Sequence, residues 1–180
     1  MAEDHQFKQG MLQLSSIPDQ SIFHGHKELL EELLRQGNLK EENLTGKVLD
    51  LGCGRGISTL ALRYFTSEIY AVDVNPNDLK SKILTTILPH ERAVCEDARQ
   101  YLKRTREDYD LIAFFGLTIP CSLRELYELC NAKLKTDGKV LFHSLQRAKE
   151  VKALQKELGG LVIASGEEAD RAYVLVKKRD

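Results

Sequence analysis

The sequence predicts an α/β fold, a seven-stranded, mostly parallel, doubly wound sheet with helices on both faces. Three observations predict it. Short apolar runs alternate with amphipathic helical segments along most of the 180 residues. The apolar run Val48 to Leu51 ends in glycines at every second position, Gly52, Gly54 and Gly56, and a helical pattern follows at once. The last two strand-like runs are only six residues apart, too few for a crossover helix, so they form a hairpin whose last strand is antiparallel.

The first 45 residues are expected to form an irregular N-terminal segment and one helix. Leucines recur on one helical face from His26 to Gln36, and Gly37 is a natural stop. We take Gly25 as the break before this helix. We expect residues 1–45 to cover the substrate side as a lid and residues 46–180 to form the ligand-binding domain, the whole being one compact domain.

The remaining elements follow in the order strand, helix, strand. Asn75 can cap a helix that begins at Pro76, Ser122 and Glu125 form a capping box, and Asp137 with the following glycine makes a turn into the fifth strand. The expected strands are 48–51, 68–74, 92–96, 109–115, 140–145, 161–165 and 172–177, and the expected helices after the first are 57–66, 76–88, 98–103, 122–134 and 146–158.

Composition and charge indicate an ordinary globular protein. Hydrophobic residues make up 42%, charged residues 29%, and the formal net charge is −1. Such a balance predicts neither a nucleic-acid surface nor a membrane surface. The N-terminal stretch is polar, no run has transmembrane length, and the four cysteines lack zinc or C-x-x-C spacing. We expect a cytoplasmic protein with reduced thiols and no metal.

The glycine turn distinguishes between ligand classes. A dinucleotide fingerprint, G-x-G-x-x-G, needs its third glycine at position 57, where this chain has Ile57. The P-loop pattern is also missing from the sequence. Asp50 stands two residues ahead of the turn, which disfavours a pyrophosphate but suits a ligand that carries an ammonium and a sulfonium group. These features favour S-adenosylmethionine.

The run Val48-Leu-Asp-Leu-Gly-Cys-Gly-Arg-Gly56 resembles the first motif of the class I, Rossmann-like S-adenosylmethionine-dependent methyltransferases. The resemblance extends further, because Asp73 and Asp97 end the next two strands, where that family binds ribose and adenine. Residues 134–141 and the terminal hairpin also resemble the family, so the similarity covers residues 44–177. It implies a methyltransferase whose cofactor is S-adenosylmethionine.

The resemblance also assigns roles to residues. Asp50 and the backbone from Gly52 to Gly56 would hold the methionine end, Asp73 the ribose hydroxyls and Asp97 the adenine amino group. Each acid has an alternative role as a cap or strand-end carboxylate. The expected cofactor-binding residues are Asp50, Gly52, Cys53, Gly54, Gly56, Asp73, Val74, Asp97, Ala98 and Phe115.

The stretch after the fourth strand bears on the methyl acceptor. The Asp/Asn-Pro-Pro-aromatic motif typical of base and glutamine amino-nitrogen methyltransferases is missing from residues 110–120. Those substrates are therefore disfavoured. Among the remaining acceptors we expect an O or N of a small molecule, although the sequence does not decide between small molecule, protein and RNA. Methyl transfer from a sulfonium needs mainly alignment and desolvation, with a base only if the acceptor loses a proton. The candidates for that base are His143, His24 and His26, each of which has a structural alternative.

Other functions stay open at this point. Residues 97–112 are similar to spermidine synthases, but the catalytic Asp of those enzymes is replaced here by Phe115, Gly116 or Leu117. An aminopropyltransferase is therefore disfavoured. The main alternative is a non-catalytic S-adenosylmethionine-binding or partner-regulating module, and a methyltransferase of protein or RNA ranks below it. Because the late connections are short, a docked substrate or a homodimer partner could complete the acceptor pocket.

Overall fold

The computed structural model describes residues 20–116, 121–144, 148–168 and 171–179, which contain seven strands in one sheet. The strand order is β3-β2-β1-β4-β5-β7-β6, and β7 runs antiparallel to both of its neighbours while the other pairs are parallel. The predicted fold class is confirmed, including the antiparallel last strand. The strands are β1 (Val48–Leu51), β2 (Ile69–Asp73), β3 (Ala93–Cys95), β4 (Tyr109–Phe115), β5 (Leu134–Ser144), β6 (Val162–Glu168) and β7 (Arg171–Lys177).

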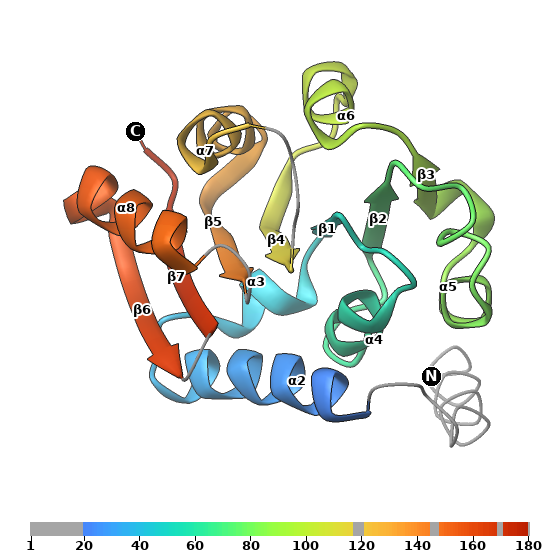
Figure 1. Ribbon diagram of the computed structural model, residues 1–180, viewed down its shortest axis with the longest axis horizontal. Coiled ribbons are helices and arrows are strands. Elements are labelled where there is room, and N and C mark those ends of the chain that lie inside the picture. The colour runs from blue at the N-terminus through green and yellow to red at the C-terminus, as the bar shows by residue number, and fades with distance from the viewer. Residues whose placement is uncertain (1–19, 117–120, 145–147, 169–170, 180) are drawn as a thin grey trace.

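Helices cover both faces of the sheet, so the protein has three layers (Figure 1). The helices of one face are α2 (Gln20–Arg35), α3 (Glu41–Thr45), α4 (Ile57–Arg63) and α5 (Lys82–Ile87), and those of the other face are α6 (Ala98–Arg104), α7 (Leu123–Asn131) and α8 (Ala148–Leu158). Two short 3₁₀ turns, η1 (His90–Arg92) and η2 (Gly159–Leu161), precede β3 and β6. Each face has its own apolar cluster, which explains why the central strands carry apolar side chains on both of their faces.

Helix α2 begins six residues earlier than the sequence predicts, and Gly25 lies inside it. Phe23 and His26 are buried on the same helical face as Leu30 and Leu33. A glycine in a helix interior costs about 1 kcal/mol relative to alanine, and burial of one phenylalanine side chain contributes more than that. Packing against the sheet therefore overrides the glycine as a break.

Helix α5 also departs from the prediction, since it begins at Lys82 rather than at residue 76. Its cap is Ser81, whose hydroxyl accepts a hydrogen bond from the N–H of Leu84 at 3.2 Å. The predicted cap, Asn75, instead accepts from the N–H of Asn77 at 3.0 Å and forms a local turn. Asparagine serves caps and turns equally well, so its presence alone does not locate a helix.

Three smaller boundaries differ as well. Strand β5 begins at Leu134 instead of 140, because the strand passes through the expected turn, where Asp137 has φ of 63°, and shifts register against β4. Helix α3 lies in a stretch expected to be a polar link, and α7 ends at Asn131 rather than 134. The Ser122 cap of α7 is confirmed, because its hydroxyl accepts from the N–H of Glu125 at 3.1 Å.

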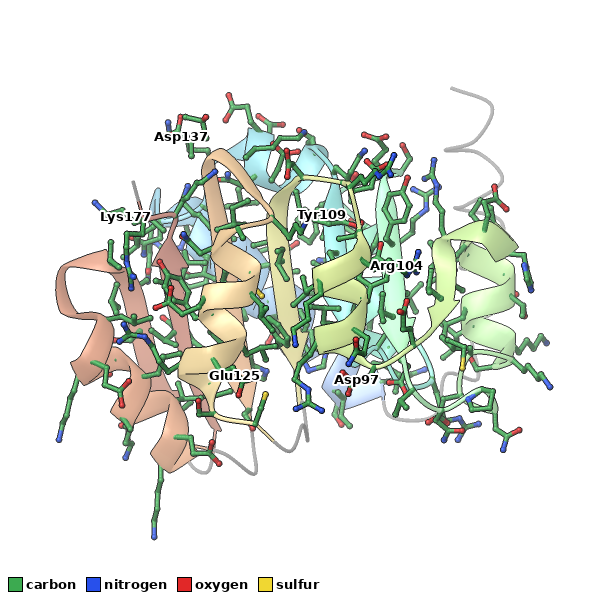
Figure 2. The ribbon with its side chains drawn as sticks, turned by 90° about the horizontal axis from the view of Figure 1, so that it is seen from above. Asp97, Arg104, Tyr109, Glu125, Asp137 and Lys177 are labelled. Carbon is green, nitrogen blue, oxygen red and sulfur yellow. The ribbon has the colours of Figure 1, made fainter. Side chains whose placement is uncertain are left out.

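Figure 2 distinguishes the edge of the sheet where the parallel strands end from the edge where they begin. Asp97 and Glu125 lie at the edge where the parallel strands end, whereas Tyr109, Asp137 and Lys177 lie at the opposite edge. Ligands of open α/β sheets bind outside the carboxyl ends of the strands. The first of these edges, called the carboxyl edge below, is therefore the place to look for a site. Among the described helices, none combines the length and the apolar character that crossing a bilayer requires.

Candidate functional site

The glycine turn after β1 has the backbone conformation that the sequence predicts. Gly52, Gly54 and Gly56 all have positive φ, at 72°, 50° and 91°. A Cβ on Gly56 would lie 2.6 Å from Cγ of Leu84, so that position has no room for a side chain. A Cβ on Gly54 would meet nothing within 4 Å. The turn is thus packed against α5 at one end and faces open space in its middle, where a ligand can approach the backbone.

Asp73, at the end of β2, connects the glycine turn to the turn that follows β2. Its Oδ2 accepts from the N–H of Gly54 at 2.8 Å, and its Oδ1 accepts from the N–H of Asn75 at 2.9 Å. A carboxylate offers about four acceptor positions, so two remain for a diol. The next residue, Val74, is 70% exposed, which is unusual for a valine and suits packing against a planar ring.

Asp50 lies in the middle of the sheet and is fully buried. The hydroxyls of Ser58 and Thr59, in the first turn of α4, both donate to its Oδ2 at 2.7 Å. Burial raises the pKa of Asp50 to about 6, against the lowering effect of these two hydrogen bonds and with a further increase from the charge of Asp73. Its Oδ1 has no hydrogen-bond partner among the described residues. A buried oxygen without a partner is expected to face a bound group.

Asp97 has the structural role that the sequence analysis gives as the alternative to binding adenine. It is the N-cap of α6, and its Oδ1 accepts from the N–H groups of Arg99 and Gln100 at 3.0 and 3.2 Å. Partial burial raises the pKa of Asp97, but hydrogen bonds from Arg99 and from the Gln100 backbone lower it more. The adjacent Ala98 is buried in α6. All these bonds use Oδ1, so contact of Oδ2 with adenine stays a prediction.

Together these groups fit S-adenosylmethionine, whose charged methionine end, ribose and adenine need different partners. The unpartnered Oδ1 of Asp50 suits a cation, Asp73 has free acceptor positions, and Val74 is an exposed apolar surface. Cys53 is buried in the turn and its burial raises the pKa of the thiol, so the thiol stays protonated. Within the described ranges, no group of three His, Cys, Asp or Glu side chains is placed to hold a metal ion.

The ends of β4 and β5 are joined to α2 by three rings. Phe115 is paired with His143 across the parallel ladder. The ring of His26, from α2, has its centroid 4.4 Å from that of Phe115 and 5.4 Å from that of His143. All three side chains are buried. Phe115 therefore lies beneath α2, and His26 fastens the helix to the carboxyl edge.

A cleft of about 770 Å³ opens between α2 and the strands β5, β6 and β7. Two of the predicted histidines, His24 and His143, line it from opposite sides, whereas His26 is not among the lining residues. Its volume is in the range of small-molecule and cofactor sites. The acids Glu28, Glu32 and Glu167 and the ring of Tyr173 also line it.

The sequence analysis did not predict several of these residues. Ser58 and Thr59 come two and three residues after Gly56, and this closeness to the glycine turn could have indicated them as partners of Asp50. Glu28 and Glu32 are four residues apart on α2, a spacing that places them on one helical face. No local pattern in the sequence indicates Tyr173, because only the pairing of β7 with β5 and β6 brings it to the cleft.

Comparisons with known proteins agree with this geometry. Residues 22–167 match the family model described as a methyltransferase domain. A curated relative, ribosomal RNA small subunit methyltransferase G of Thermotoga petrophila, is 34% identical over an alignment of 142 positions that covers 74% of this chain and 59% of the relative. The protein of the same name from Thermotoga maritima is also 34% identical, over 74% of this chain and 57% of that relative. The chain thus spans less than two thirds of the length of these relatives.

Solved structures show the same fold at lower identity. The N-methyltransferase NodS from Bradyrhizobium japonicum superposes with a TM-score of 0.65 at 19% identity, covering 90% of this chain and 99% of that one. A Streptococcus mutans protein solved in complex with SAH gives a TM-score of 0.56 at 15% identity, covering 75% of this chain and 90% of that one.

Proposed function

Because the chain belongs to the methyltransferase domain family, we propose that it transfers methyl groups from S-adenosylmethionine to RNA, with small-subunit ribosomal RNA as the acceptor class. The family, the enzyme class and the cofactor predicted from the sequence are confirmed at the level of the methyltransferase domain. The acceptor rests on one observation, the 34% identity over 142 residues to an enzyme named for ribosomal RNA. This proposal replaces the small-molecule acceptor that is expected from the sequence.

When bound, S-adenosylmethionine would supply an electrophilic methyl group to a lone pair of the acceptor, with S-adenosylhomocysteine as the product. The protein's own contribution is positioning. Asp73 holds the glycine turn and offers acceptors to a diol, while the buried Asp50 offers its free oxygen to a cation. We assign the acceptor side to α2, and we take His143 as the first candidate for holding a proton that the acceptor loses. Residues 1–19, which the sequence also predicts to cover the substrate side, lie outside the described residues.

Three exposed cations beside the glycine turn offer a surface for RNA phosphates. The hydroxyl of Ser81 donates to the carbonyl of Arg55 at 2.8 Å, and Lys80 and Lys82 flank that serine. None of the three cationic side chains has a hydrogen-bond or ion-pair partner within the described part of the chain. The net charge of −1 conceals this local group, which we call the cation cluster.

Replacing all three cations of the cluster by glutamine is expected to weaken RNA binding at low salt. Each lost phosphate contact to a single strand reduces the slope of log affinity against log salt by about 0.7, so the triple variant should lose about 2 units of slope. Fluorescence anisotropy with a labelled ribosomal RNA fragment, titrated over a range of salt, measures it. The control carries the same charge change at Lys103, Arg106 and Lys156, exposed residues of other elements. Equal slopes for the two triple variants would remove the cluster from the RNA surface.

Transfer of labelled methyl groups tests the function itself. The protein is incubated with tritiated S-adenosylmethionine and either purified small ribosomal subunits, naked small-subunit RNA or a small-molecule extract. Label in RNA that survives phenol extraction and disappears with ribonuclease supports the proposal. Label only in the small-molecule fraction would instead favour the small-molecule acceptor expected from the sequence, for which the cleft beside α2 has a suitable volume.

A further inference from the structure

We propose that the cleft beside α2 is the acceptor subsite and that it takes an unpaired base by its amino-bearing edge, with Glu28 as the hydrogen-bond acceptor and Tyr173 as the stacking surface. This rests on the proposed function, and it adds which part of the protein reads the acceptor and by what chemistry. The supporting observations are the position of the cleft, the charges of its walls and the arrangement of its aromatic ring.

The cleft has the right position on the carboxyl edge. The glycine turn follows β1, β4 lies next to β1, and β5, which ends in His143, lies next to β4. Neighbouring strands are about 4.8 Å apart, so His143 is about 10 Å across the sheet from the turn. The cleft therefore lies one strand beyond Phe115 on the same carboxyl edge that carries the glycine turn.

The charges of the cleft walls select against phosphate. Of the described residues that line the cleft, three are glutamates and none is lysine or arginine. Glu32 is held by Arg35 and Gln36, and Glu167 pairs with Lys152 at 2.9 Å. Glu28 has neither a hydrogen-bond nor an ion-pair partner among the described residues, so its carboxylate is available. A carboxylate makes strong charge-assisted hydrogen bonds to amino groups.

Tyr173 presents an aromatic surface in the same cleft. It pairs with His143 on β5 and with Gly166 on β6. A Cβ on Gly166 would lie 2.5 Å from Cε1 of Tyr173, so the ring lies over a position that only glycine leaves open. Burial raises the pKa of Tyr173, which keeps the phenol neutral. A ring of this kind stacks on a base irrespective of its sequence, at about 1–3 kcal/mol per base.

The phosphates would then lie outside the cleft, along the cation cluster at the other side of the glycine turn. The acid-lined cleft and the cation cluster would thus divide the recognition of an RNA strand between one base and the backbone of neighbouring nucleotides. This division explains how an acidic pocket can belong to an enzyme that acts on a polyanion.

Nucleoside binding to the protein loaded with S-adenosylhomocysteine tests the assignment without requiring turnover. Adenosine, guanosine, cytidine and uridine are titrated separately and followed by NMR chemical shifts. We expect the three nucleosides with exocyclic amino groups to bind more tightly than uridine. Glu28→Gln should weaken those three about fivefold and leave uridine unchanged. Tyr173→Leu should weaken all four nucleosides.

The matched control is Glu31→Gln, which removes the same charge from an exposed face of α2 where Glu31 pairs with Lys27. It should bind all nucleosides as the parent does. Equal behaviour of Glu28→Gln and Glu31→Gln in a protein that methylates RNA would overturn the cleft assignment and leave the proposed function standing. Dependence of nucleoside binding on Glu28 in a protein that never methylates RNA would support the subsite and overturn the proposed function.

Discussion

Replacing Asp73 by alanine will weaken the binding of S-adenosylmethionine by about 1–3 kcal/mol, or roughly 5- to 150-fold in Kd. Two effects add. The carboxylate that would accept from the ribose hydroxyls is lost, and the N–H groups of Gly54 and Asn75 lose their acceptor. The second effect loosens the glycine turn itself, so S-adenosylhomocysteine should lose affinity by a similar factor. Isothermal titration calorimetry with both ligands measures the change.

Two comparisons make the Asp73 result interpretable. Asp108→Ala removes one carboxylate from an exposed position just before β4, at the opposite edge of the sheet, and should bind the cofactor as the parent does. Asp73→Asn keeps one acceptor oxygen and should fall between the parent and Asp73→Ala. Circular dichroism confirms that each variant is folded. A folded Asp73→Ala protein with the parent's Kd would mean that Asp73 serves only to join the two turns.

The fold followed from the sequence because hydrophobic periodicity decides which segments are buried. The alternation of apolar runs and amphipathic segments placed every strand and most helices, and the short last connection determined the antiparallel β7. Boundaries were less predictable where the same residue serves two purposes. Gly25 breaks an isolated helix but is tolerated once Phe23 packs against the sheet, and Asn75 forms a turn as readily as a cap.

The geometry around the glycine turn, where we propose that the cofactor binds, could be predicted because its residues are local in sequence. Asp50 and the three glycines lie within one strand and turn, and Asp73 ends the next strand. The residues of the proposed acceptor cleft could not be predicted, since they meet only through the pairing of β7 with β5 and the packing of α2. Glu28 and Tyr173 are 145 positions apart, and no local pattern links them.

The second large effect is a pH dependence that originates in Asp50. Burial raises the pKa of this carboxyl to about 6 from its ordinary value of 3.8. The folded protein therefore holds a proton that the unfolded chain has lost between these two pH values. The free energy of unfolding falls as pH rises through this window, by about 3 kcal/mol in all. Roughly 2 kcal/mol of the loss lies between pH 4.5 and 7.5.

Asp50→Asn isolates this contribution. The amide oxygen can still accept from Ser58 and Thr59, but the side chain no longer titrates. The free energy of unfolding of the parent, minus that of the variant, should therefore fall by roughly 2 kcal/mol from pH 4.5 to pH 7.5. Urea denaturation at a series of pH values measures it, with Asp108→Asn as the control for the loss of one acidic group. A difference that does not vary with pH would show that Asp50 is not the titrating group.

The affinity for the cofactor should change with pH in the opposite direction to the free energy of unfolding. A cation beside the free Oδ1 favours the ionised carboxyl, so S-adenosylmethionine should bind more tightly as pH rises through about 6. Asp50→Asn should bind with an affinity that varies less over the same range. If the parent and Asp50→Asn gained affinity equally, the free oxygen would face some group other than the cofactor. The destabilising, uncompensated charge in the ligand-free protein would thus be what makes the glycine turn selective for a cationic ligand.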